Sequence, residues 1–264
     1  PIALLGVPVD CNSSFLAGCA QAPPMIRAAL RSASANDFAE NGVDISAPGL
    51  LVDVGDLLLF NRAEDHDAIR AAVERQLALR RGVVSMGGDH SITYPIMRAF
   101  APHYPGLTIL HFDAHPDLYD DFEGNRYSHA SPFARIMEEK LAVRLIQVGI
   151  RTMTTHQRAQ ADRFGVQVVE ARHFTDRAIK PPAGPVYITI DLDALDPAFA
   201  PGVSHHEPGG LSVRDILSVL QQVPGPIVGA DVVELNPTRD WQGMTAMVAA
   251  KFVRELVGLM AAGG

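Results

Sequence analysis

Eight short apolar runs constrain the fold of this 264-residue chain more than any other feature. Most of them are continuously apolar, whereas a strand with one solvated face alternates apolar and polar residues. Continuous apolar runs are typical of strands that are buried on both faces, as in a parallel sheet. The runs lie at residues 2–8, 50–55, 82–87, 107–113, 143–150, 166–170, 186–192 and 227–235.

Helical patterns separate several of these runs. In the segment 64–80, Ile69, Val73 and Leu77 recur at helical spacing. In the segment 211–222, Ser212 is a candidate N-cap. Strands that alternate with helices predict a three-layer α/β fold with right-handed crossovers. Neither a linker nor a repeat divides the sequence, so we expect one domain over residues 1–264. The helical segments are 64–80, 131–140, 211–222 and 244–260.

Composition excludes several classes of protein. A hydrophobic content of 47% and a charged content of 20% argue against disorder. A net charge of −8, without a block of Lys or Arg, disfavours nucleic acid and anionic membranes as partners. No apolar run approaches the roughly 20 residues that span a bilayer. Cys11 and Cys19 indicate free thiols, and the apolar start lacks the basic region of a signal peptide, so we expect a cytoplasmic protein.

Ionisable side chains follow four of the predicted strands, at the point where each strand ends. Ligands of open α/β sheets bind beyond the carboxyl ends of the strands. Side chains spaced by two along an extended chain point to one side, and polar groups that converge there are costly to bury unless something binds them. The alternative is a solvated strand end with a turn at His115–Pro116. The residues are His90, then Asp113, His115 and Asp117, then Asp191 and Asp193, and finally Glu234.

Two imidazoles and four carboxylates in this set predict a metal centre. Mixed nitrogen and oxygen ligands with a carboxylate majority suit manganese or another borderline-hard divalent ion. A catalytic zinc takes about three protein ligands, so this set is too large for one such ion. With bridging carboxylates it suits a pair of ions about 3.5–4 Å apart, and we expect two Mn²⁺ ions per chain. The expected ligands are His90, Asp113, His115, Asp117, Asp191 and Asp193.

The charge of the cluster predicts a cationic substrate. Four carboxylates balance two divalent ions, so a bridging hydroxide and Glu234 leave an excess of negative charge. Such a hydroxide is a strong nucleophile near neutral pH, and the carbon of a guanidinium group is a fitting electrophile. Glu234 could hold the guanidinium nitrogens, and His129 is the candidate proton shuttle to the leaving amine. We expect Asp117, His129 and Glu234 to take part in catalysis.

Three motifs resemble the ureohydrolase family of arginases and agmatinases. They are GGDHS at 87–91, DAHPD at 113–117 and DLDALDPAFAPG at 191–202. The resemblance runs over nearly the whole chain and is strongest to plant-type arginases. It implies a three-layer α/β/α sandwich with a mainly parallel eight-stranded sheet, assembled as a homotrimer or homohexamer. It also implies His129 as the acid/base histidine and Glu234 as the acid that binds the guanidinium group.

The same resemblance implies how the ligands divide between the two manganese ions. Asp113 and Asp191 would bridge the ions. One ion would be held by His90, Asp113, Asp117 and Asp191, and the other by His115, Asp113, Asp191 and Asp193. The resemblance also implies the reaction, which is hydrolysis of L-arginine to ornithine and urea through a metal-bridging hydroxide.

The substrate loop leaves the identity of the substrate open. Residues 119–129 lack the serine- and asparagine-rich run of animal-type arginases, and Asn125, Arg126 and Ser128 are the candidates to bind a substrate carboxylate. Agmatine, cleaved to putrescine and urea, is the nearest alternative substrate, followed by another guanidino compound such as guanidinobutyrate. Two further hypotheses stay open, a deacetylase-like amide hydrolase with one zinc ion and a non-enzymatic metal-binding protein.

Overall fold

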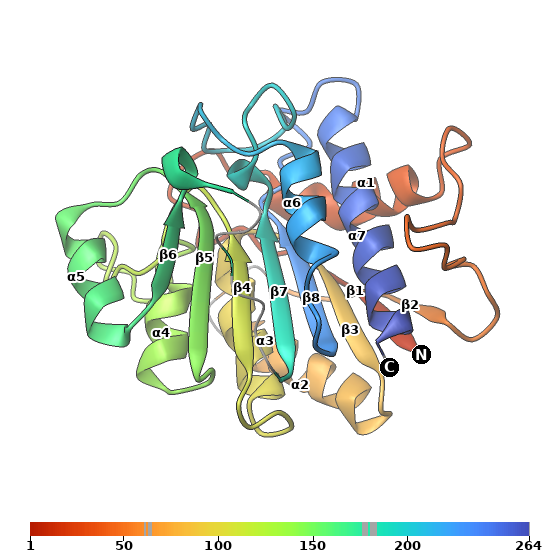
Figure 1. Cartoon of the computed structure of the whole chain (residues 1–264), viewed down its shortest axis with the longest axis horizontal. Helices are drawn as coiled ribbons and strands as arrows, with labels where there is room; N and C mark the ends of the chain where they lie inside the picture. Colours follow the sequence, from red (N-terminus) through yellow and green to blue (C-terminus); the bar gives the residue numbers. More distant parts are fainter. Residues whose placement is uncertain (61, 63–64, 176–178, 180–183, 264) are drawn as a thin grey trace.

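A single eight-stranded sheet organises the computed structural model, which describes residues 1–60, 62, 65–175, 179 and 184–263. All strand pairings are parallel, in the order β2-β1-β3-β8-β7-β4-β5-β6 (Figure 1). Each predicted run forms a strand whose ends lie within two residues of the expected ones. The strands are β1 (Ile2–Val7), β2 (Leu51–Asp56), β3 (Gly82–Gly87), β4 (Thr108–Phe112), β5 (Arg144–Ile150), β6 (Gln167–Glu170), β7 (Val186–Asp191) and β8 (Ile227–Val233).

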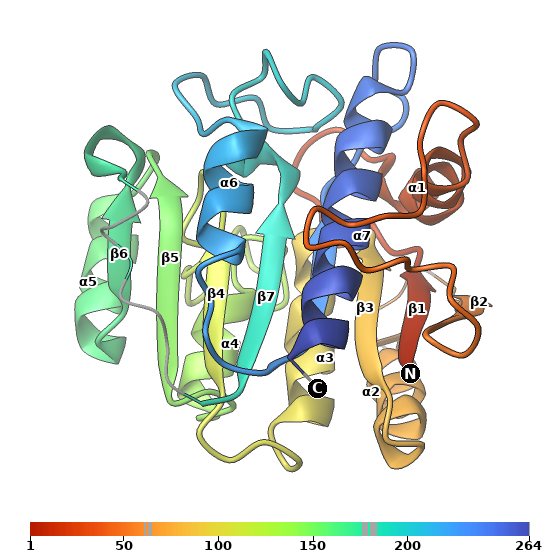
Figure 2. The same cartoon turned by 45° about the vertical axis from the view of Figure 1, so that its right-hand side comes forward.

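Helices cover both faces of the sheet, which confirms the expected three-layer α/β/α sandwich (Figures 1 and 2). One layer holds α1 (Ala22–Leu30), α6 (Val213–Leu220) and α7 (Met244–Ala262). The other holds α2 (Asp65–Ala78), α3 (Thr93–Phe100), α4 (Pro132–Glu138) and α5 (Thr155–Phe164). The four predicted helices are α2, α4, α6 and α7, although the first predicted residue, Glu64, lies outside the described residues. Among the described residues, none of the helices is both long and apolar enough to traverse a lipid bilayer.

Three helices, α1, α3 and α5, were not predicted from the sequence. Helix α3 has only eight residues, too few to show a helical repeat clearly in the sequence. Helix α5 is polar, and its signals lie at its ends instead. Thr154 and Gln157 form a capping box at its start, and Gly165 ends it with a φ of 64°. Those local signals could have identified α5 from the sequence.

Each central strand contributes side chains to two separate hydrophobic cores. On β4, Ile109 packs into the core under α2 to α5, and the next residue, Leu110, packs into the core under α1, α6 and α7. Tyr187 and Ile188 alternate in the same way on β7. Because both faces are buried, both sets of alternating positions must be apolar, which explains the continuous apolar runs.

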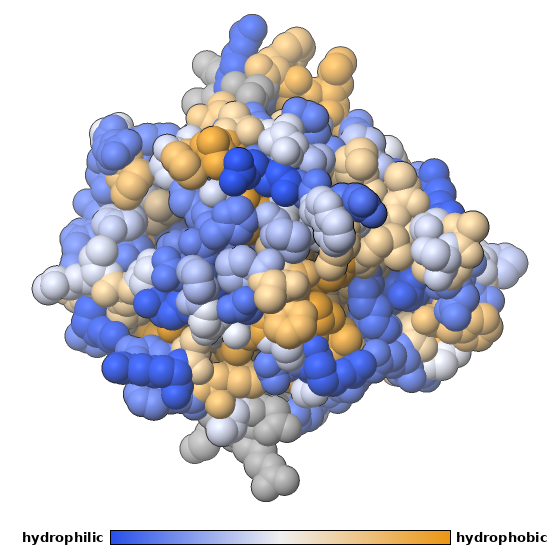
Figure 3. Space-filling model, turned by 90° about the horizontal axis from the view of Figure 1, so that it is seen from above, coloured by the Kyte–Doolittle hydropathy of each residue, from blue (hydrophilic) through white to orange (hydrophobic). Residues whose placement is uncertain are grey.

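The carboxyl ends of all eight strands lie along one edge of the sheet. Figure 3 views the molecule from this edge, where hydrophilic residues cover most of the surface and a smaller hydrophobic area lies near the centre. β4 ends at Phe112, so Asp113, His115 and Asp117 lie in the loop beyond it rather than alternating along a strand. The predicted strand periodicity is therefore wrong for these residues. The backbone turns there instead, and Asp117 has a φ of 50°.

We expect Gly88→Ala to lower the free energy of unfolding by about 1–3 kcal/mol, because the position has no room for a methyl group. A Cβ atom at Gly88 would lie 2.1 Å from the carbonyl oxygen of Val9 and 2.8 Å from that of Val7. Both oxygens belong to backbone that is held in place, since Gly88 N donates to Val7 O and Asp89 N donates to Val9 O. Urea denaturation measures the effect.

Gly263→Ala is the matched control for this substitution. The nearest atom to a Cβ at Gly263 is 3.6 Å away, and its φ is −98°. We expect this variant to unfold at the urea concentration of the unsubstituted protein. Equal stability of the two variants would contradict the steric account of Gly88.

Candidate metal centre

Four neighbouring strands carry the candidate site at their carboxyl ends. β3 leads into His90, β4 into Asp113 and β8 into Glu234, while β7 ends at Asp191. These strands are adjacent in the order β3-β8-β7-β4, so their ends meet at the middle of the sheet. A cavity of about 170 Å³ lies beyond them. Its walls are formed by Ser14, His115, Asp117, Tyr119, Phe122, His129, Ala130, Thr152, Thr154, Gln157, Asp191, Asp193, His205 and Glu234.

The first group of candidate ligand atoms surrounds His90, whose side chain is fully buried. Its Nδ1 atom lies 3.1 Å from Oδ2 of Asp113, and 3.2 Å from the Oδ2 atoms of both Asp117 and Asp191. Among the described residues, this buried nitrogen has no hydrogen-bond partner. A cation at the centre of these four atoms would be bound by one nitrogen and three carboxylate oxygens.

The second group surrounds His115 and shares Asp113 with the first. Nδ1 of His115 lies 3.4 Å from Oδ1 of Asp113 and 3.0 Å from Oδ2 of Asp193. Asp191 joins the two groups, because its Oδ1 accepts a hydrogen bond of 2.8 Å from the backbone N–H of Asp193. The structure thus brings all the predicted ligand residues together, in two adjoining groups.

The charges of this cluster fit a divalent cation. Burial, together with the charge of Asp113, raises the pKa of Asp117 to about 7, and burial beside Asp193 and Asp113 raises the pKa of Asp191 well above its usual value. Burial alone would lower the pKa of His115, but the Asp193 and Asp113 carboxylates raise it to about 12. Protons therefore neutralise the cluster when no cation is bound. Cations would replace them on a donor set that hard or borderline divalent ions prefer.

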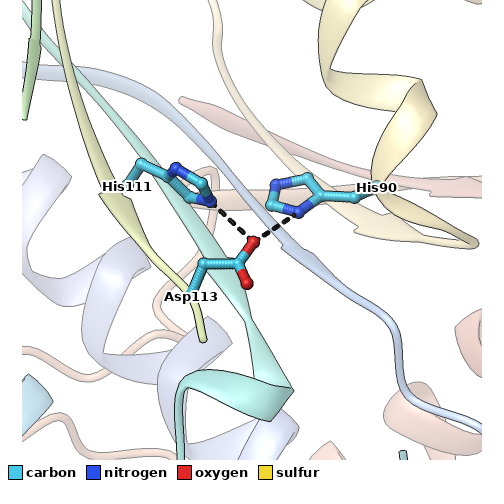
Figure 4. A group of neighbouring side chains, drawn as sticks. All are labelled: His90, His111 and Asp113. Atoms are coloured by element: carbon cyan, nitrogen blue, oxygen red, sulfur yellow. Dashed lines mark hydrogen bonds and ion pairs between the residues drawn. The ribbon is translucent and has the colours of Figure 1, made fainter. Parts of the chain in front are cut away.

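His111 belongs to the site and was missed by the sequence analysis (Figure 4). Its Nε2 lies 2.8 Å from Oδ2 of Asp113, and its Nδ1 accepts a hydrogen bond of 3.1 Å from Nε2 of Gln147. That amide also donates to the carbonyl of Pro116, which fixes its orientation. The proton of His111 is therefore on Nε2, so the ring orients Asp113 by donating to it rather than binding a cation. The spacing of two between His111, Asp113 and His115 was a signal for it.

His129 and Glu234 form a buried ion pair on the cavity wall. Nδ1 of His129 lies 2.9 Å from Oε1 of Glu234, which also accepts the backbone N–H of His90 at 2.9 Å. Although burial opposes both shifts, the pair lowers the pKa of Glu234 to about 2 and raises that of His129 to about 9. Nε2 of His129 lies 2.8 Å from Oγ of Ser14. Both side chains are therefore charged at neutral pH.

Two of the acids in the cavity wall have a left-handed backbone conformation. Asp117 has a φ of 50° and Glu234 a φ of 65°. This conformation is unfavourable for residues with a Cβ atom, by about 1–2 kcal/mol, and persists where surrounding contacts enforce it. Glu234 is held by its N–H, which donates to the carbonyl of Gly88 at 2.9 Å. The strained backbone turns both carboxylates into the cavity.

The predicted substrate-binding residues Asn125, Arg126 and Ser128 do not line the cavity, and this prediction differs from the structure. The guanidinium group of Arg126 pairs with Asp120 at 3.0 Å on the surface. Nδ2 of Asn125 donates to Oδ1 of Asn12 at 3.1 Å, and the buried Ser128 accepts a backbone hydrogen bond within its own loop. These partners were not visible in the sequence, because they depend on how the loop folds back on itself.

Residues from other segments form the outer part of the cavity wall. Ser14 follows β1, and Thr152, Thr154 and Gln157 lie around the start of α5. Among the described residues, no Lys or Arg lines this cavity. Ser14 lies outside the three motifs that carry the resemblance, so the sequence did not single it out. The others gave no signal without a prediction of α5.

Known proteins share both the sequence and the fold. "Arginase 1, mitochondrial" of Arabidopsis thaliana is 52% identical, over 96% of this chain and 79% of that protein. An N(1)-aminopropylagmatine ureohydrolase of Thermus thermophilus is 35% identical, over 98% of this chain and 89% of that protein. The solved arginase from Medicago truncatula superimposes with a TM-score of 0.93 at 46% identity, covering 98% of this chain and 86% of that one.

The names of the plant relatives contradict the expected cytoplasmic location. The protein from Arabidopsis is named mitochondrial, as are those from Oryza sativa, and a second one from Arabidopsis is named chloroplastic/mitochondrial. The expectation of a cytoplasmic protein is therefore wrong. It rested on the apolar start of the sequence, and a sequence that spans only part of its longer relatives carries no information on targeting at that point.

The resemblance seen in the three motifs is confirmed across the chain. A family model described as "Arginase family" matches residues 1–258. The matched region includes all eight strands and the full set of side chains that surround the cavity. This chain therefore belongs to the arginase family.

Proposed function

We propose that this protein hydrolyses the guanidino group of L-arginine to give ornithine and urea. The observation that carries the proposal is the convergence of two adjoining ligand groups and the His129–Glu234 ion pair on one cavity. The ligand groups can activate water, and the ion pair can bind a planar cation and donate a proton. The high identity to proteins named arginase supports arginine as the substrate.

Two Mn²⁺ ions are the proposed cofactors. Two divalent cations, when bound, lower the pKa of a water molecule so that it becomes a nucleophile near neutral pH. Asp113 is suited to bridge them, since its two oxygens face His90 and His115 separately. The proposed ligands are His90, Asp113, Asp117 and Asp191 for one ion, and His115, Asp113, Asp191 and Asp193 for the other.

Glu234 binds and orients the guanidinium group in this proposal. Its carboxylate stays ionised well below neutral pH, so it can accept charge-assisted hydrogen bonds from guanidinium N–H groups. The hydrogen bonds from His90 N and His129 hold one oxygen of Glu234 in place, and the side chain lines the cavity. A planar cation that binds there lies between Glu234 and the carboxylates of the metal centre.

His129 supplies the proton that the leaving amine needs. Its Nδ1–H is committed to Glu234, while its Nε2 faces Ser14 on the cavity wall. With a pKa of about 9, the imidazolium carries both protons at neutral pH and can donate the Nε2 proton to the ornithine nitrogen as the C–N bond breaks. Asp117 acts as a ligand and not as an acid in this scheme.

Neutral hydroxyl and amide groups of the outer wall face the part of the substrate that distinguishes arginine from agmatine. Ser14 and Thr152 offer hydrogen bonds to the α-amino and α-carboxylate groups of arginine, which agmatine does not present together. We also propose that the chain assembles as a homotrimer or homohexamer, as the family resemblance implies.

We expect arginine to be hydrolysed with a higher kcat/KM than agmatine or guanidinobutyrate. A substrate that lacks the amino-acid end makes fewer hydrogen bonds to the outer wall, which lowers its binding energy in the transition state. Urea release with the manganese-loaded protein, measured for the three compounds side by side, tests this. Faster turnover of agmatine would contradict the assignment of arginine and leave the chemistry of the site in place.

Metal binding should release protons and should tighten as the pH rises. Neighbouring carboxylates raise the pKa of His115 to about 12 and that of His90 well above its usual value, so both rings are protonated at neutral pH without metal. Both must lose that proton to bind a cation, and a higher pH makes this loss easier. Calorimetric titration of Mn²⁺ in buffers with different ionisation enthalpies counts the protons. An affinity that does not change between about pH 6 and pH 8 would contradict these ligands.

His129→Asn should leave both metal ions bound and lower kcat by about 10²–10⁴-fold, the usual contribution of a positioned general acid. The manganese content per chain, measured together with the rate of urea release, separates the two roles. Loss of manganese in this variant would show that His129 is a ligand instead. His173→Asn is the control, because its side chain is 70% exposed and lies outside the cavity.

A further inference from the structure

Asp231 is a fully buried carboxylate that the proposed reaction does not use. It lies on β8 below the cavity, and three hydroxyl groups donate hydrogen bonds to its two oxygens. Thr93 Oγ1 and Tyr187 Oη lie 3.0 and 2.7 Å from its Oδ2, and Thr189 Oγ1 lies 2.5 Å from its Oδ1. Each hydroxyl has a single O–H, and in each case that O–H donates its hydrogen bond to Asp231.

Thr189 connects this carboxylate to the metal centre. Its Oγ1 also lies 2.9 Å from Nε2 of His90. Because the O–H of Thr189 donates its hydrogen bond to Asp231, Thr189 can only accept a hydrogen bond from His90. Nε2 of His90 must therefore carry the ring proton. The lone pair of the neutral ring is then on Nδ1, the atom that faces the first ligand group.

The sheet fixes this connection rigidly. Thr189 and Asp231 are register partners on the neighbouring strands β7 and β8. His90 follows β3, which lies on the other side of β8, after the short connection through Gly88 and Asp89. Its ring packs edge-on against Phe133, with 5.2 Å between the ring centroids. Neither Thr93 nor Tyr187 has a hydrogen bond to His90 among the described contacts, so these two hydroxyls bind Asp231 without reaching the ligand.

We infer that Thr189, held by Asp231, is a positioning residue that fixes the tautomer and the ring orientation of His90 and so strengthens binding of the cation at His90. The inference rests on the proposed function only in requiring that a divalent cation binds there. Hydrogen-bonded partners of histidine ligands typically change metal affinity by about 10–100-fold. Among the described residues, no similar series of hydrogen bonds reaches His115. The change in metal affinity is therefore expected at only one of the two proposed cation sites.

Thr189→Val tests the inference, because it keeps the shape of the side chain and removes the hydroxyl. We expect one of the two Mn²⁺ binding constants of the 264-residue protein to weaken by about 10–100-fold in a calorimetric titration, with the other unchanged. Thr189→Ser should restore it. Thr93→Val and Tyr187→Phe are matched controls that remove the other hydroxyls from Asp231, and both should keep the affinity of the unsubstituted protein.

The outcomes separate this inference from the proposed function. Equal weakening by Thr93→Val and Thr189→Val would show that the hydroxyls only support packing, and unchanged affinity in Thr189→Val would show no coupling. Either result overturns the inference. Failure of the unsubstituted protein to bind Mn²⁺ would overturn the proposed function as well. If Thr189→Val does not fold without metal, Asp231→Asn replaces it, and an unchanged affinity in that variant also overturns the inference.

Discussion

Repulsion among buried carboxylates is the constraint on which the rest of the structure depends. Asp113, Asp117, Asp191 and Asp193 are brought together at the end of an apolar sheet, where their charges cannot be dispersed into water. Two imidazoles are interleaved among them, and without metal these rings hold the protons that keep the cluster close to neutral. The arrangement is stable only when positive charge is supplied, so the fold itself favours the proposed site for divalent cations.

The fold maintains this unfavourable arrangement with contacts that lie outside the ligand set. Arg151 donates hydrogen bonds to the carbonyls of Gly149, Asp193 and Ala194, which holds the turn that carries Asp193 against the end of β5. His111 holds Asp113 from the side of the sheet, with its own tautomer fixed by Gln147. Polar groups that are held by several hydrogen bonds in this way are rigid, and rigidity is what a metal centre requires of its ligands.

How much the sequence predicts depends on how local the relevant interaction is. All eight strands follow from their apolar composition, and the proposed metal ligands follow from the ionisable residues at and beyond the ends of those strands. Helix α3, with eight residues, is too short for its helical repeat to be identified in the sequence. Arg126 was assigned to the substrate because a guanidinium suits a carboxylate, but nearby Asp120 satisfies it. That competition depends on the folded loop, so residue type alone could not decide it.

The site divides into two parts that are built from different elements, and this division explains how one fold can serve several substrates. The reactive end is formed where β3, β8, β7 and β4 finish, and any change there alters the charge of the proposed metal centre. The outer wall comes from the segment after β1 and the start of α5, which can change without moving a ligand. Relatives of this chain carry names that specify different substrates, and a division of this kind allows the outer wall to vary while the reactive end is kept.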